Sequence, residues 1–167
     1  MMTALSLLLM FQAAMILAAF CDLFTMTIPN RLTAGFALLF VVVALLSGMG
    51  WGAVGMHAVV GLAALALGFG LFSAGWIGGG DAKFFAATAL WIGPQLILEY
   101  TLWASLAGGL LTVGLVLARQ MPLPSGLAEH AWLARLHKAD TGIPYGVALA
   151  LAGLVIASRA PWAAGII

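Results

Sequence analysis

Charged side chains are scarce in this chain. Of its 167 residues, 7% are Asp, Glu, Lys or Arg, whereas 65% are hydrophobic. A soluble globular domain carries about 25% charged residues, so this composition excludes an ordinary soluble protein. The formal net charge of +1 supplies no basic surface, and we expect no nucleic acid as a partner. The expected surroundings are the lipid bilayer.

Cysteine occurs once, as Cys21, which excludes a disulfide framework and a cysteine-rich zinc site. Cys21 lies in an apolar stretch, where we expect a buried structural thiol. The three histidines, His57, His130 and His137, are scattered and do not have the spacing of ligands in a tetrahedral site. The sequence predicts no metal and no cofactor.

Apolar stretches fill most of the chain, and about 20 apolar residues are enough to cross a bilayer. Residues 1–21 are uncharged and lack the basic start and cleavage site of a secretory signal, so we expect a retained first span. Residues 32–80 contain no charge and fit two crossings with a glycine-rich turn at 48–52. Three further spans are expected at 84–98, 100–118 and 143–158. The sequence therefore predicts an all-α, polytopic membrane protein with about six transmembrane helices in one bundle, forming a single domain over residues 1–167.

The basic residues predict an orientation. If the N-terminus lies outside, the cytoplasmic segments contain five of the six basic residues, namely Arg31, Lys83, Arg119, Arg135 and Lys138. Only Arg159 then lies outside. This bias follows the positive-inside rule, so we expect an outer N-terminus and a cytoplasmic loop at 119–142.

Two of the five acidic residues lie at the ends of apolar spans. Asp22 ends the first span and Asp81 the third, so this topology places both at the cytoplasmic face. Ionisable groups beside the bilayer core are costly, and each is a functional-site hypothesis. Each also has a structural alternative, because Asp81 could be the N-cap of the next helix and Asp22 a headgroup anchor. As a pair, two carboxylates could share one proton, so that one activates a water while the other donates to a carbonyl oxygen.

The residues around Asp81 are candidates for positioning a substrate. Gly78 and Gly80 lack a Cβ atom, so a backbone or a substrate can approach Asp81 closely. Lys83 has two interpretations. It could orient a substrate, or it could extend to the headgroups and fix the topology.

Residues 119–142 are the one long polar stretch. Prolines at 122 and 124 are expected to end the preceding helix. A short amphipathic helix is then predicted in the inner interface, as a connector or as a substrate-docking surface, with an apolar face made of Ala128, Trp132, Leu133 and Leu136.

Three segments resemble the type IV prepilin peptidases, a family of intramembrane aspartyl proteases. Residues 78–83, Gly-Gly-Gly-Asp-Ala-Lys, resemble the family's G-x-G-D motif. Residues 22–30, which end in Ile-Pro-Asn, resemble its first-aspartate segment, and residues 142–148 resemble its closing Pro-Tyr-Gly span. The resemblance implies that Asp22 and Asp81 are catalytic. It also implies prepilin or pseudopilin substrates, cut at the cytoplasmic face of the bacterial inner membrane.

Larger members of this family carry a cytoplasmic insert with paired C-x-x-C motifs after the first span, and they also N-methylate the new pilin terminus. This chain runs from Asp22 to Leu32 without such an insert. It resembles the short, cleavage-only branch that serves Flp-type pili, which implies no methyltransferase activity.

Two other function classes stay open at this point. An ion-coupled carrier could use Asp22 and Asp81 as a proton or cation relay. A structural assembly subunit could use Gly48-x-x-x-Gly52 as a helix contact. The sequence does not predict the oligomeric state.

Overall fold

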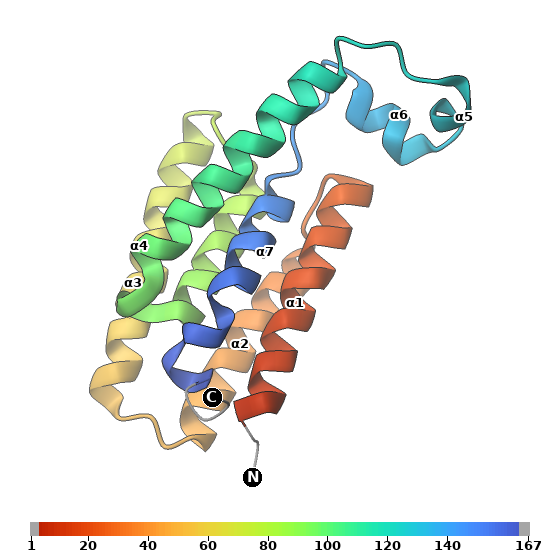
Figure 1. Cartoon of the computed structure of the whole chain (residues 1–167). Coiled ribbons are helices and arrows are strands. Elements are labelled where there is room, and N and C mark those ends of the chain that lie inside the picture. The colour runs from red at the N-terminus through yellow and green to blue at the C-terminus, as the bar shows by residue number, and fades with distance from the viewer. Residues whose placement is uncertain (1–3, 164–167) are drawn as a thin grey trace.

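The computed structural model describes residues 4–163, and all regular elements in this range are helical. The long helices form one bundle, and two short helices project from one end of it (Figure 1). The elements are α1 (Ala4–Thr25), α2 (Asn30–Leu46), α3 (Trp51–Ser73), α4 (Gly79–Ala118), α5 (Ser125–Ala128), α6 (Ala131–His137), α7 (Tyr145–Ile156), η1 (Ala157–Arg159) and η2 (Pro161–Ala163).

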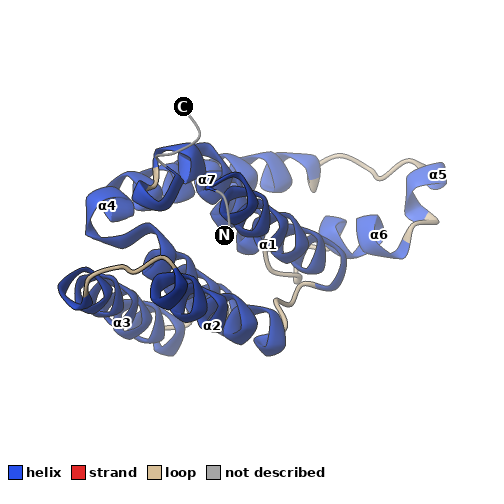
Figure 2. Cartoon of the chain, turned by 90° about the horizontal axis from the view of Figure 1, so that it is seen from below, coloured by secondary structure: helices blue, strands red, loops and turns tan. Residues whose placement is uncertain are grey.

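The fold is that of a helical membrane protein, as the sequence predicts. By length and composition, α1, α3 and α4 can each cross a bilayer, and α2 and α7 are shorter apolar helices. Large apolar side chains face outward along the bundle, among them Leu62, Leu98 and Leu110, which are 66%, 83% and 76% exposed. An outer surface of this kind suits lipid, because apolar side chains that face lipid tails are not exposed to water. In the end-on view of Figure 2, α1 and α7 form one side of the bundle and α2 and α3 the other, with α4 reaching both.

Helix α4 is bent back on itself. Gly93 has a non-helical backbone (φ 70°, ψ −172°), and Pro94 follows it. A straight helix would separate residues 85 and 100 by about 22 Å. Instead, the rings of Phe85 and Tyr100 stack with their centroids 5.5 Å apart. The two arms therefore run side by side, and with α4 counted as two passes the bundle has the six apolar passes that the sequence predicts. The predicted boundary at 98–100 was wrong, because the chain turns at Gly93.

A histidine stabilises this bend. Pro94 has no N–H group, so the carbonyl of Leu90, four residues earlier, lacks its helical donor. The Nδ1 atom of His57 in α3 lies 2.8 Å from that oxygen. His57 is 4% exposed, and its ring stacks on Phe40. His57 thus supplies the donor that the proline removes.

The core near the bend is aromatic. Trp91 is fully buried and donates its indole N–H to the carbonyl oxygen of Phe36 over 2.8 Å. The rings of Phe11, Phe36, Phe40 and Trp162 surround Trp91. This cluster joins α1, α2 and α4 to η2.

Three details differ from the sequence-based expectations. The polar loop contains two short helices, α5 and α6, so Ala128 does not share a helix with Trp132, Leu133 and Leu136. Cys21 is only partly buried. Gly48 and Gly52 have open space where a Cβ atom would lie, and Gly48 has φ +69° and ends α2, so within the chain it serves a turn and not a helix contact.

Candidate active site

Asp22 lies in the last turn of α1 and is held by the beginning of α7. Its side chain is 5% exposed, and the backbone N–H of Gly146 donates to its Oδ2 atom over 2.6 Å. Gly146 is the second residue of α7, after Pro144 at the N-cap. The first N–H groups of a helix have no partner within it, and they favour a carboxylate both by hydrogen bonding and through the helix dipole. The position of Asp22 therefore depends on a contact between the first and the last long helix.

Asp81 lies in the first turn of α4, where Gly78 is the N-cap residue. The N-cap alternative for Asp81 is therefore wrong in detail, since Asp81 is the third residue of the helix. The backbone N–H groups of Gly78 and Gly146 face its carboxylate, and Asp22 lies close enough to act on it electrostatically. The structure thus brings together the two acids that the sequence places at one face.

Both carboxylates line the same two cavities at this end of the bundle. The smaller cavity, of about 250 Å³, also contains Met26, Ile28 and Asn30. The larger, of about 510 Å³, extends between the α3–α4 loop and the segment that precedes α7. Open space therefore lies directly against both Asp22 and Asp81.

The carboxylate oxygens occupy space that is free because two neighbouring residues are glycines without a Cβ atom. A Cβ atom on Gly78 would lie 2.8 Å from Oδ2 of Asp81, and one on Gly146 would lie 2.8 Å from Oδ2 of Asp22. Gly80, by contrast, packs against the backbone of Ile28, with 3.4 Å between the Ile28 nitrogen and an added Cβ. Of the two glycines proposed from the sequence, Gly78 is the one that touches an aspartate.

The segment after α1 turns sharply beneath the site. Met26 has φ 56°, the left-handed conformation that usually falls to glycine, and its N–H donates to the Asp22 carbonyl oxygen over 2.8 Å. The turn sends Ile28 inward, where its side chain reaches the position of Gly146. A non-glycine residue in this conformation is a strained position, of the kind that gathers at functional sites.

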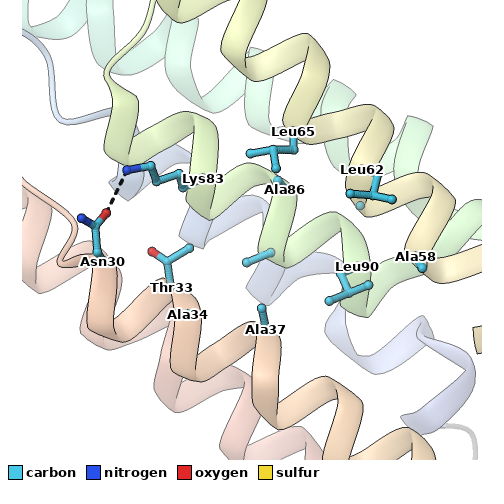
Figure 3. A pocket seen from close by; sticks show the side chains of 12 residues that line it. Asn30, Thr33, Ala34, Ala37, Ala58, Leu62, Leu65, Lys83, Ala86 and Leu90 are labelled. Carbon is cyan, nitrogen blue, oxygen red and sulfur yellow. Dashed lines mark hydrogen bonds between the residues drawn. The ribbon is translucent and has the colours of Figure 1, made fainter.

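Lys83 does not line either carboxylate cavity. Its Nζ atom donates to Oδ1 of Asn30 over 3.0 Å, so it ties the start of α4 to the start of α2 (Figure 3). This bond joins the Ile-Pro-Asn segment to the segment that contains Asp81.

Sequence reasoning missed the roles of two residues at the site. Gly146 was noted only as part of the Pro-Tyr-Gly segment, although its N–H contacts the first aspartate. Arg119 was treated only as a topology signal, but it donates to the carbonyl oxygens of Leu136, Thr141 and Gly142 and lines the larger cavity. It thereby fixes the segment that leads into α7.

The polar loop is attached to the end of α1. Arg135 in α6 donates to the carbonyl oxygen of Phe24 over 2.8 Å, and the ring of Trp132 packs edge-on against Phe24. The α5–α6 segment therefore lies beside the turn that follows Asp22.

This arrangement suits the hydrolysis of an amide bond. Two adjacent carboxylates can hold a water molecule between them, with one acting as base and the other as acid. Among the residues described, no three His, Cys, Asp or Glu side chains are grouped as metal ligands.

A comparison with models of known families also indicates a peptidase. Residues 9–113 match the family model described as the type IV leader peptidase family. No curated protein and no solved structure matches the chain. The matched region covers well over half of the chain and includes both Asp22 and Asp81. The chain therefore belongs to the type IV leader peptidase family.

Proposed function

We propose that this protein is a membrane-embedded aspartyl endopeptidase that removes the short leader from type IV prepilins of the Flp-like kind, at the cytoplasmic face. The observation that carries the proposal is the meeting of Asp22 and Asp81 beside Gly146, which contacts the first carboxylate and faces the second. Membership of the type IV leader peptidase family supports the same reaction.

In the proposed reaction, the ionised aspartate takes a proton from a water molecule, and the oxygen of that water attacks the scissile carbonyl carbon. The protonated aspartate gives its proton to the carbonyl oxygen. When the tetrahedral intermediate collapses, the C–N bond breaks and the leaving nitrogen takes the proton of the protonated aspartate. As the new carboxyl group forms, one hydroxyl of the intermediate gives its proton to the other aspartate. One acid and one base remain, ready for the next cycle.

The expected substrate follows from the depth of the site. Asp22 ends one apolar helix and Asp81 begins another, so the carboxylates reach only a bond at the edge of the membrane. We expect the cut between a short basic leader and the apolar helix that follows it, after a glycine as in the family that the chain resembles. The short connection between α1 and α2 and the single cysteine support cleavage without methyl transfer.

The test is the processing of a Flp-type prepilin by purified protein, with sequencing of the new N-terminus. Asp22→Asn and Asp81→Asn should each abolish cleavage, because an amide can neither accept nor donate the shared proton. The matched control is Asp140→Asn, since Asp140 is exposed and lies outside both cavities. It should cleave like the wild type.

Normal processing by either site variant would overturn the two-aspartate mechanism. If no prepilin is cut but proton-driven ion uptake depends on both aspartates, the protein is instead an ion-coupled carrier.

A further inference from the structure

An apolar groove of about 580 Å³ runs along the side of the bundle between α2, α3 and the first arm of α4 (Figure 3). Most of its lining consists of small or aliphatic side chains: Ala34, Ala37, Ala58, Gly61, Leu62, Leu65, Ala86, Ala87 and Leu90, with Thr33. The hydrogen-bonded pair of Asn30 and Lys83 lies at one end, and Ala58 and Leu90 at the other (Figure 3). The groove is thus apolar along its length and polar at one end.

This groove meets the carboxylate site at Asn30. Asn30 lines the groove and also lines the smaller cavity, which contains Asp22 and Asp81. A chain that lies in the groove with one end at Asn30 therefore ends beside the cavity that contains both carboxylates.

The shape of the groove suits a helix. Its lining runs from Asn30 to Ala37 on α2 and from Lys83 to Leu90 on α4, which is about two helical turns or about 10 Å. Inside a membrane, small residues let two helix backbones approach closely, and the resulting van der Waals packing helps to hold the helices together.

We infer that this groove receives the first two turns of the substrate's apolar helix, on the carboxyl side of the bond that is cut. This inference rests on the proposed peptidase function, and it assigns the helix-binding surface of that enzyme. Lys83 sets the direction of binding. Its positive charge at the polar end of the groove repels a basic leader, so the apolar segment enters the groove instead. The leader then lies on the other side of the carboxylates.

The first experiment is disulfide crosslinking. In a Cys21→Ser, Asp81→Asn background, which removes the sole cysteine and leaves the substrate uncut, either Ala34→Cys or Ala63→Cys is added. Both alanines are exposed, but only Ala34 lines the groove. The probe is a synthetic prepilin with a short basic leader ending in glycine and a leucine–alanine helix of about 20 residues. A series of probes carries a single cysteine at each of the first eight positions of that helix in turn.

We expect crosslinks to Ala34→Cys that recur about every 3.6 positions, and none to Ala63→Cys. Equal crosslinking at both sites would overturn the inference. If the wild-type enzyme nevertheless cuts the probe, the proposed function stands. If the wild type fails to cut any prepilin, the function itself has failed.

The second experiment measures cleavage by Ala34→Trp and Ala63→Trp in detergent. The indole at position 34 fills the groove, so kcat/KM should fall by about tenfold or more, mainly through KM. Ala63→Trp should stay close to the wild type. Mass spectrometry of the purified proteins tests whether the groove instead holds a phospholipid. A phospholipid held by the wild type and lost in Ala34→Trp, without any crosslink, would assign the groove to lipid and overturn the inference.

Discussion

The two carboxylates are held by backbone N–H groups and not by basic side chains. Gly146 donates to Asp22, and Gly78 and Gly146 face Asp81. Between residues 4 and 163 the recorded ion pair joins Arg159 to Glu99, and neither site aspartate takes part in one. A carboxylate without a cationic partner is not locked in its ionised form. The pair can therefore exchange a proton during a reaction cycle.

Gly78→Ala should reduce activity much more than stability. The added Cβ would lie 2.8 Å from Oδ2 of Asp81, so the carboxylate must move, but a side-chain end moves at little cost in folding energy. Gly78 has φ −72°, so alanine introduces no backbone strain. A displacement of about 1 Å can cost about 100-fold in rate, and we expect kcat to fall by about 10- to 100-fold.

The control for this variant is Gly114→Ala, because an added Cβ on Gly114 meets nothing within 4 Å. Prepilin cleavage rates and melting temperatures in detergent should be measured for both proteins. Full activity in Gly78→Ala would mean that the Asp81 carboxylate is not held where catalysis needs it.

Catalysis should depend on pH with a bell-shaped profile and should not respond to chelators. At low pH both carboxylates are protonated and no base remains, whereas at high pH both are ionised and no acid remains. The measurement is prepilin cleavage across a pH series, with EDTA and a thiol-alkylating reagent added at the optimum. Inhibition by EDTA that added zinc reverses would contradict the aspartyl mechanism.

At the scale of elements, the bend of α4 places the site residues of α7. The second arm of α4 begins after Gly93 and packs along α7, where Gly108 contacts the ring of Tyr145. The hydroxyl of Tyr145 lies 3.1 Å from Oγ1 of Thr112 on the same arm. Tyr145 precedes Gly146, so the bend, the second arm and the N–H groups at Asp22 form one chain of contacts.

His57→Phe should destabilise the bend without altering the carboxylates directly. Phenylalanine keeps the ring that stacks on Phe40 but leaves the Leu90 carbonyl without its donor. An unpaired buried carbonyl costs about 1–3 kcal/mol. Thermal unfolding in detergent should therefore occur at a lower temperature.

His57→Gln provides a test of this explanation, because an amide can still donate to Leu90 and should recover part of the loss. His130→Phe is the matched control, since His130 is exposed outside the bundle. Equal melting temperatures for His57→Phe and the wild type would show that the bend does not need this hydrogen bond.

At the scale of the whole molecule, most of the basic side chains lie at the same end as the two site carboxylates. Arg31 is the second residue of α2, Lys83 is the fifth of α4, and Arg119 directly follows α4. Arg135 and Lys138 lie in and after α6, beside the end of α1 that contains Asp22. Arg159 lies with Glu99 at the opposite end, where α1 begins (Figure 1).

This distribution predicts a cytoplasmic site end and an outer opposite end, by the positive-inside rule. Alkaline phosphatase, which is active only outside, should be active when fused after residue 167 and inactive when fused after Gln120. Green fluorescent protein should give the reverse pattern at the same two positions. The opposite result for both reporters would place the carboxylates on the outer face.

The sequence by itself determined the features that depend on local composition. Apolar length predicts the membrane passes, and an even number of passes between Asp22 and Asp81 returns both acids to one face. A glycine-rich turn is predicted at 48–52, and there Gly48, with φ +69°, follows the end of α2. These properties need no knowledge of which helix packs against which.

Only the tertiary structure decided which groups hold the acids and where a substrate could lie. Gly146 and Asp22 are 124 residues apart in the chain, and no periodicity links them. The bend at Gly93 needs His57 from another helix, and the groove forms where α2 and α3 both pack against one arm of α4. Helix packing creates these contacts between distant segments, and many pairings of apolar helices satisfy the same composition, so the sequence pattern could not choose among them.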